Sequence, residues 1–331
     1  MKHLIVSSTH YNHLEKGFKE WLDILGYAEK TVSTLPVHIH ELFHYLEGRR
    51  IPHIKGMQPR HISDFISHLK SRTNTTYGGG LSSSHINKSI HAIKTFVQYL
   101  NQTGKYDIDI VLSKVPDEIE EKVILTQAEL RQLYDSTFDH YPLGGAAKGQ
   151  RDRAIIAVFY GCGLRRTEGI RLNTTDIDLV KGLLFVRKGK GNKQRYVPVA
   201  RKSLEDIRVY LEEGRGWYME DHYGGNYHYN RHGRPYKKKA KTDDEAFFLT
   251  QKGTRMVDFY YRLDQMIERS GINKAFSLHS LRHSIATHLL QSGMPIAEIA
   301  RFLGHSSLTS TQIYTHIVNH LKQEADEPES L

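Results

Sequence analysis

The amino-acid sequence predicts a mainly α-helical protein with a small antiparallel β-sheet, an α+β fold in two domains. The chain has 331 residues, enough for about two domains of roughly 150 residues each. Along most of the chain, apolar residues recur at three- and four-residue steps, which is the spacing of one buried helix face. One stretch in the middle instead has the short alternating pattern of two strands joined by a turn.

The first domain is expected over residues 1–112 as a bundle of short helices. Between Leu81 and Leu100 the apolar side chains fall on one helix face, and Ser82 to Ser84 offer N-terminal caps. Gly104 lies where this helix would end. Three earlier segments have similar apolar spacing: Leu14–Leu25, Ile39–Leu46 and Ile62–Leu69.

The second domain is expected over residues 123–331, after a linker at residues 113–122. Thr126-Gln-Ala-Glu129 has the form of a capping box, so a helix should begin there. A further helical region runs from Arg153 to Leu172, with an interruption near Gly161–Gly163. Helical patterning returns after residue 256.

Two strands and a long loop should interrupt the helices of the second domain. Residues 182–187 and 193–199 alternate like strands, and the turn Lys188–Asn192 between them contains glycines. An insertion loop is expected over residues 214–245. Its section 214–241 has seven basic and two acidic residues among tyrosines and glycines, without apolar periodicity. We favour a solvated loop, although an arm that becomes ordered on a polyanion such as DNA would have the same composition.

The charge balance suggests a polyanionic partner. Lys and Arg number 46 against 37 Asp and Glu, which gives a net charge of +9 and a pI near 9.3. Nucleic acid is the simplest such partner. The alternative is a soluble protein that is basic for other reasons.

Several classes of site are not predicted. The single cysteine, Cys162, cannot form a disulfide within the chain and is expected to be a small buried packing residue. The 21 histidines are scattered and lack HExxH spacing, so no metal ion or other cofactor is expected. No apolar run reaches the roughly 18 residues of a membrane span, and we expect a cytoplasmic protein without a membrane partner.

Two clusters of residues suggest chemistry on a phosphodiester. The upstream cluster reads Gly-Leu-Arg-Arg-Thr-Glu and then Gly-Lys-Gly-Asn-Lys, and the downstream one has His-Ser-Leu-Arg, Leu-Gly-His and a tyrosine. Without a metal ion, cleavage needs positive charge at the nonbridging oxygens, an acid and a nucleophile. Arginine suits the first role, because its planar fork donates two hydrogen bonds and stays charged. The candidate catalytic residues are Arg165, Lys190, His279, Arg282, His305 and Tyr314.

In type and order these six residues resemble the tyrosine recombinases, the phage integrase family. The resemblance implies a helical core-binding domain of SAM-like fold that binds DNA, followed by a catalytic domain. It also implies that Tyr314 attacks phosphorus to form a 3′-phosphotyrosyl ester, while Lys190 protonates the leaving 5′ oxygen and His279 accepts the tyrosine proton. Arg165, Arg282 and His305 would stabilise charge on the phosphate. The family usually has a leucine directly after the glutamate of the upstream cluster, whereas here Glu168 is followed by Gly169.

The expected function is therefore site-specific recombination, in DNA integration, excision or resolution. The resemblance implies double-stranded DNA target sites as partners and a homo-tetramer on DNA, and it favours Xer-like or mobile-element enzymes. A type IB topoisomerase and a catalytically idle DNA-binding regulator are the alternatives. A metal-dependent nuclease is disfavoured, because the carboxylates form no evident metal-binding set.

Overall fold

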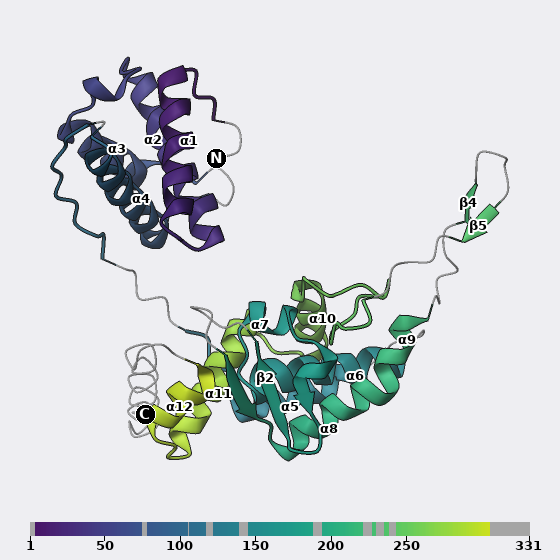
Figure 1. Ribbon diagram of the computed structural model, residues 1–331. Helices are drawn as coiled ribbons and strands as arrows, with labels where there is room; N and C mark the ends of the chain where they lie inside the picture. Colours follow the sequence, from purple (N-terminus) through teal and green to yellow (C-terminus); the bar gives the residue numbers. More distant parts are fainter. Residues whose placement is uncertain are drawn as a thin grey trace. The chain divides into compact units, whose positions relative to one another are not determined.

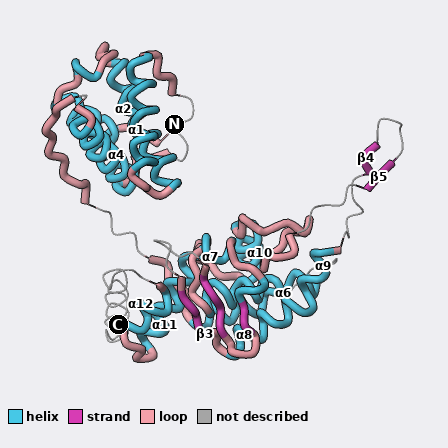
Figure 2. Tube along the Cα trace, viewed as in Figure 1, coloured by secondary structure: helices cyan, strands magenta, loops and turns pink. Residues whose placement is uncertain are grey.

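The structure is a computed structural model, and it describes residues 4–74, 78–104, 106–116, 122–138, 145–187, 194–220, 227–229, 235–237 and 243–304. The chain divides into two compact units, an N-terminal unit, Met1–Glu120, and a C-terminal unit, Glu121–Leu331. Helices dominate both units, and the three-stranded antiparallel sheet belongs to the C-terminal unit (Figures 1 and 2). The predicted fold class is thus confirmed. None of the described helices combines the length and the apolar character that a membrane span needs.

The N-terminal unit is a helical bundle with its own apolar core. Ser82 caps the last helix by accepting from the His85 amide, and the predicted apolar face of that helix is buried. The second helix begins well before the predicted segment, because its buried face continues across Pro36 through Val32 and Leu35. The helices are α1 (Thr9–Ile24), α2 (Glu29–Gly48), α3 (Pro59–Ser71) and α4 (Ser83–Gln102), with a 3-10 turn at Ile54–Gly56.

The C-terminal unit begins as the sequence predicts. Thr126 and Glu129 form the capping box that opens α5. Helix α5 spans Gln127–Asp135. The helices that follow it are α6 (Gly145–Ile156), α7 (Arg166–Ile170), α8 (Arg201–Val209), α9 (Arg215–Met219), α10 (Tyr260–Ser270), α11 (Leu278–Gln291) and α12 (Ile296–Leu303). Shorter helical turns lie at Ser136–Phe138, Ala157–Gly161, Thr174–Asp176 and Tyr210–Gly214.

The sheet of the C-terminal unit has the strand order β1-β2-β3. Strands β2 (Leu183–Val186) and β3 (Arg195–Pro198) pair antiparallel, as the sequence predicts, with Val186 opposite Arg195. The turn Lys188–Asn192 lies outside the described residues. Strand β1 (Ile177–Asp178) was not predicted, since two residues are too few to show an alternating pattern.

The expected start of the insertion loop at residue 214 is wrong. Helical structure continues through α9 to Met219, and Tyr218 is buried at 1% exposure. The Arg151 guanidinium lies 4.4 Å from the centroid of the Tyr218 ring, a contact between residues far apart in sequence that no local pattern reveals. Within the rest of the segment, β4 (Tyr227–Tyr229) pairs antiparallel with β5 (Pro235–Lys237).

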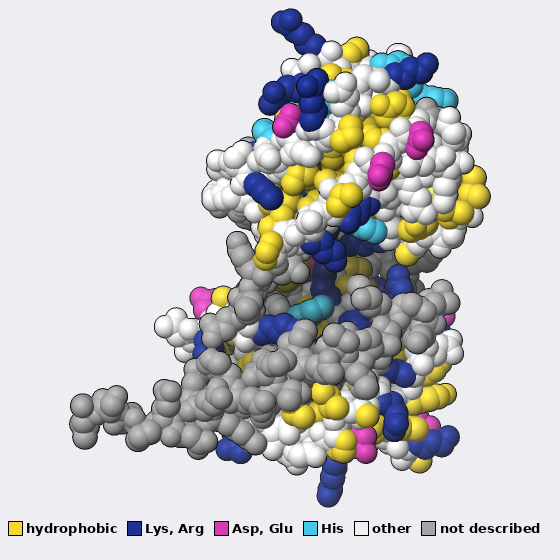
Figure 3. Space-filling view, turned by 90° about the vertical axis from the view of Figure 1, so that its left-hand side faces the viewer, with side chains coloured by type: hydrophobic (Ala, Val, Ile, Leu, Met, Phe, Trp, Pro, Cys, Tyr) yellow, Lys and Arg dark blue, Asp and Glu magenta, His cyan; other side chains and the backbone are white. Residues whose placement is uncertain are grey.

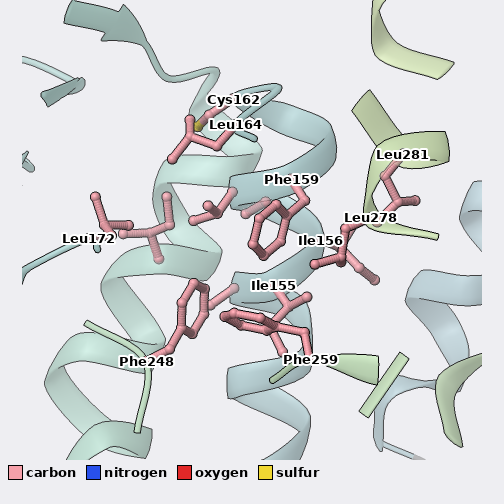
Figure 4. Close-up of a cluster of buried hydrophobic side chains, with 14 of the residues drawn as sticks. Ile155, Ile156, Phe159, Cys162, Leu164, Leu172, Phe248, Phe259, Leu278 and Leu281 are labelled. Carbon is pink, nitrogen blue, oxygen red and sulfur yellow. The ribbon is translucent and has the colours of Figure 1, made fainter. Parts of the chain in front are cut away.

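The core of the C-terminal unit is built around aromatic rings. Phe159 meets Phe259 edge to face at 5.1 Å between centroids, and Phe248 meets Phe259 in the same way at 5.3 Å. Figure 4 shows this cluster, in which Cys162 packs beside Leu164. Cys162 is fully buried, and burial raises the pKa of its thiol to about 12, so it is the predicted packing residue.

Gly169, the departure from the family pattern, is explained by Phe159. A Cβ at Gly169 would lie 2.4 Å from Cζ of Phe159. Neither group can move freely, because Phe159 has no exposed surface and Gly169 lies within α7. The Phe159 ring therefore occupies the space of a side chain at residue 169, and glycine is required there.

We expect Gly169→Ala to destabilise the C-terminal unit by about 1–3 kcal/mol through overpacking, although alanine favours helices. In a Phe159→Leu background the same substitution should cost much less, since the ring that it meets is gone. Urea unfolding measured by Trp217 fluorescence in a Trp21→Phe background reports on this unit alone.

Gly216 provides the matched control for this prediction. It lies in α9, and a Cβ there would meet nothing within 4 Å, so Gly216→Ala should be neutral or slightly stabilising. An equal cost for Gly169→Ala with and without the Phe159 ring would contradict the explanation.

Candidate active site

A tight turn before α7 sets the position of Arg165. Gly163 has φ of +59°, and a Cβ on it would lie 2.8 Å from Cδ2 of Leu303. Glycine thus lets the turn pass close to the end of α12. Arg165 then caps α7, and its backbone N–H donates to Oε2 of Glu168 at 2.9 Å.

The carboxylate of Glu168 is the centre of the site. Arg165 donates through Nη1 to Oε1 at 2.8 Å, and Arg195 donates through Nη1 and Nη2 to the two oxygens at 3.0 and 2.9 Å. Arg282 lies 4.0 Å away, measured from Nη1 to Oε2. Burial would raise the pKa of Glu168, but the hydrogen bonds and charge of Arg195, together with the bonds from Arg165, lower it to about 2.

The end of α12 receives the same three guanidinium groups. A helix leaves its last carbonyls without partners inside the helix, and these carbonyls form the negative end of its dipole. Here each of three consecutive carbonyls accepts from a different arginine: Phe302 from Nε of Arg195 at 3.2 Å, Leu303 from Nη2 of Arg282 at 2.7 Å, and Gly304 from Nη2 of Arg165 at 2.9 Å.

Gly304 is required by this arrangement. It ends α12 in the left-handed conformation with φ of +66°, and a Cβ there would lie 2.7 Å from Nη1 of Arg195. Any larger residue would displace the Arg195 guanidinium. The Leu-Gly-His motif of the sequence thus contains the glycine that fits α12 against the arginine cluster.

His279 lies in the first turn of α11 near the two predicted catalytic arginines. Partial desolvation of the ring, and then the charges of Arg282 and Arg165, lower its pKa. Arg282 is on the same helix, 4% exposed, and also donates to the Gly163 carbonyl. The structure therefore brings Arg165, His279 and Arg282 together from distant parts of the chain.

The other three predicted catalytic residues, Lys190, His305 and Tyr314, lie outside the described residues. Two of them are close in sequence to the cluster. His305 follows Gly304 directly, and Lys190 belongs to the turn between β2 and β3, whose Arg195 is bound to Glu168.

Sequence reasoning did not identify Arg195 as part of this site. Its only signal is a basic residue at the start of a predicted strand, which is common on protein surfaces. The arginine becomes informative only when the fold pairs it with Glu168, from which it is separated by the predicted hairpin turn.

The sequence of the C-terminal unit is similar to a known protein family. The sequence model described as the phage integrase family matches residues 124–320. The chain belongs to the phage integrase family. As a tyrosine recombinase it is a site-specific recombinase, an enzyme that transfers DNA strands.

Related proteins match this chain along almost its whole length. The tyrosine recombinase XerC of Oceanobacillus iheyensis is 30% identical over 318 residues, 92% of each chain. Among solved structures, XerH site-specific recombinase bound to a palindromic difH substrate has a TM-score of 0.67 at 22% identity, and the match covers 95% of this chain and 83% of XerH. A lambda integrase tetramer bound to a Holliday junction has a TM-score of 0.62 at 15% identity, with 93% and 78% covered.

At these identities the solved structures establish the fold, and the family match establishes the class of enzyme. The topoisomerase and the idle-regulator alternatives are not favoured, because the matching relatives are tyrosine recombinases over nearly the full chain.

We expect Glu168→Gln to destabilise the C-terminal unit by about 3 kcal/mol at pH 7, because it leaves buried arginines without their anion. The pKa of Glu168 is lowered from 4.5 to about 2, so its contribution is fully present above pH 4.5 and is lost as pH falls through about 2. The difference in unfolding free energy between wild type and variant should therefore shrink across that range, as measured by urea unfolding with Trp217 as reporter.

Glu205→Gln is the control, since Glu205 also bonds an arginine, Arg208, but at the exposed surface. Its cost should be much smaller than that of Glu168→Gln, because solvent screens an exposed ion pair. A Glu168→Gln protein with wild-type stability at pH 7 would show that the carboxylate charge does not stabilise the cluster.

Proposed function

We propose that Tyr314 of this recombinase attacks the scissile phosphate and forms a 3′-phosphotyrosyl ester. The Tyr314 oxygen bonds to phosphorus, the bond from phosphorus to the 5′ oxygen breaks, and the 5′ strand leaves as a hydroxyl. His279 accepts the tyrosine proton, and Lys190 donates a proton to the 5′ oxygen. A 5′ hydroxyl from another strand then reverses these steps, so that strands are exchanged without loss of the bond energy.

The observation that carries this proposal is that Arg165 and Arg282 meet at Glu168 and that both lie close enough to His279 for their charges to lower its pKa. Arginine donates to phosphate oxygens in fixed geometry and stays charged during the reaction. The guanidinium groups of Arg165 and Arg282 both donate to carbonyls at the end of α12, directly before His305. This supports a shared phosphate-binding role for Arg165, Arg282 and His305.

The lowered pKa of His279 suits a proton acceptor. An imidazole that is neutral at pH 7 has a free lone pair, whereas an imidazolium does not. The two arginines that lower the pKa of His279 are those proposed to bind the phosphate, so charge stabilisation and proton acceptance support each other.

Double-stranded DNA target sites are the proposed substrate, and the proposed assembly is a homo-tetramer on DNA, as in the lambda integrase structure. The net charge of +9 favours a polyanion. On the face in Figure 3, Lys and Arg side chains (dark blue) are spread over both units, and Asp and Glu (magenta) are fewer. We propose that unit Met1–Glu120 grips DNA and that the enzyme acts in the cytoplasm on Xer-type or mobile-element sites.

Tyr314 should be the single point of covalent attachment. With a nicked suicide substrate, whose cleaved 5′ fragment diffuses away, we expect the wild-type protein to form a 3′-linked complex that survives denaturing gels. Tyr314→Phe should bind the same DNA but form no complex, because it lacks the nucleophilic oxygen.

Peptide mapping of the trapped complex checks the assignment. Tyr196→Phe is the matched control, an exposed tyrosine of the same unit that should trap normally. Attachment to another tyrosine would overturn the role of Tyr314. A separate assay for strand exchange between two DNA sites distinguishes recombination from relaxation of supercoiled DNA.

Lys190 can be tested at one atom. If it protonates the leaving 5′ oxygen, Lys190→Ala should slow cleavage of ordinary DNA by about 10²- to 10⁴-fold. In a substrate with sulfur in place of that bridging oxygen, the leaving group is a thiolate, which needs no proton. Lys190→Ala should therefore cleave this substrate at close to the wild-type rate.

Two comparisons make the sulfur experiment specific. Arg165→Ala and Arg282→Ala should show little rescue, because their task is charge on the nonbridging oxygens. Rescue of Lys193→Ala in place of Lys190→Ala would move the acid along the hairpin, and rescue of neither would exclude both lysines.

A further inference from the structure

Three side chains of the N-terminal unit form a cluster that has no place in the cleavage chemistry. His38 and Glu41 of α2 and His85 of α4 each offer one ligand atom, and these atoms all lie within 4.8 Å of one another. His38 is 8% exposed and Glu41 is 5% exposed, so the cluster lies where α2 packs on α4.

Two of these residues have a buried polar atom without a hydrogen-bond partner. Oε2 of Glu41 and Nε2 of His85 are both buried and unpaired. Leaving a buried polar atom unpaired normally costs free energy, so such atoms point to a ligand that satisfies them. The two atoms belong to the same cluster and therefore point to one ligand.

The third residue, His38, presents a suitable nitrogen. Its Nδ1 lies 2.9 Å from Oγ of Ser89, and the Ser89 hydroxyl donates to the His85 carbonyl at 3.4 Å. The tautomer of His38 with its proton on Nδ1 would donate to the Ser89 oxygen, and it would leave the lone pair on Nε2. Metal-binding histidines are commonly oriented in this way by a partner on their other nitrogen.

Glu41 is held in place as a carboxylate. Its Oε1 accepts from Nη2 of Arg72 at 2.6 Å, and its Oε2 is buried without a hydrogen-bond partner. A water molecule could join Oε2 to His85, but two imidazole nitrogens and a carboxylate oxygen together form a donor set for transition metals. Ca²⁺ and Mg²⁺ prefer oxygen ligands throughout.

We propose that His38, Glu41 and His85 bind a divalent transition-metal ion of the zinc class, which cross-links α2 to α4. Bonds of about 2.0–2.2 Å place the ligand atoms of a tetrahedral ion roughly 3.4 Å apart. The three side chains therefore need to move closer by about an ångström around the ion, which small torsional rotations achieve.

The surrounding charges limit how tightly the ion is held. The Arg72 guanidinium shares the Glu41 carboxylate, and its charge repels a cation. Arg72→Gln should therefore bind the metal more tightly than wild type, provided that Glu41 keeps its position. Such a gain is the reverse of what loss of a purely structural ion pair would give.

The test uses the full chain after treatment with a chelator. Co²⁺, whose visible absorption reports nitrogen and oxygen ligands, is titrated into the wild type and into His85→Gln, and Zn²⁺ is then added to displace it. We expect His85→Gln to bind fewer Co²⁺ ions than wild type by about one equivalent. The control is His91→Gln, an exposed histidine of the same helix, which should bind as wild type does.

Thermal unfolding keeps the proposal testable if the variant folds poorly. Trp21 in a Trp217→Phe background reports on the N-terminal unit, and Trp217 in a Trp21→Phe background reports on the other. A saturating excess of Zn²⁺, about 100-fold over Kd, should raise the Tm of the N-terminal unit by about 5 °C or more, and it should leave the other Tm unchanged.

Three results would overturn the site. Equal Co²⁺ binding by wild type and His85→Gln would place the metal elsewhere among the histidines. A Tm of the N-terminal unit that does not respond to Zn²⁺ would leave a bridging water as the ligand. An equal shift of both units would indicate binding outside this cluster.

Discussion

The C-terminal unit depends on one buried carboxylate that neutralises and orients three arginines. Glu168 bonds Arg165 and Arg195 and lies within 4.0 Å of Arg282. The same arginines bind three consecutive carbonyls at the end of α12, so α7, β3, α11 and α12 meet at a single point. Removing the carboxylate would leave like charges facing one another in a region with little water, where their repulsion is strong.

In the proposed mechanism, this arrangement also prepares the site for an anion. Three guanidinium cations around one carboxylate leave an excess of positive charge, which a DNA phosphate would reduce. The free energy needed to gather the arginines would then be spent during folding, before DNA binds, and hydrogen bonds to fixed carbonyls would limit their movement. Arginine suits this dual role better than lysine, because its several N–H groups allow bonds to a carboxylate and a carbonyl together with an approach to phosphate.

The sequence was sufficient where the cause is local. The Ser82 cap and the Thr126–Glu129 capping box depend on residues within one turn. The two motifs that contain Arg165 and His279 to Arg282 also drew attention by residue type, and their catalytic role stays a prediction. Contacts between distant segments could not be predicted. The bond of Arg195 to Glu168 and the burial of Tyr218 against Arg151 exist only once the chain has folded, and neither leaves a periodic pattern.

The cluster at His38 was missed for the same reason, since His85 lies far from His38 and Glu41 in sequence. Comparison of the two buried carboxylates indicates why they suit different ligands. Both oxygens of Glu168 accept from arginines, so the carboxylate is poorly placed to bind a metal ion, and in the proposed mechanism it orients cations for phosphate. Glu41 has one oxygen paired with Arg72 and one unpaired beside two imidazoles. If both proposals hold, the number of carboxylate oxygens already paired with arginine decides whether the site binds an anion or a cation.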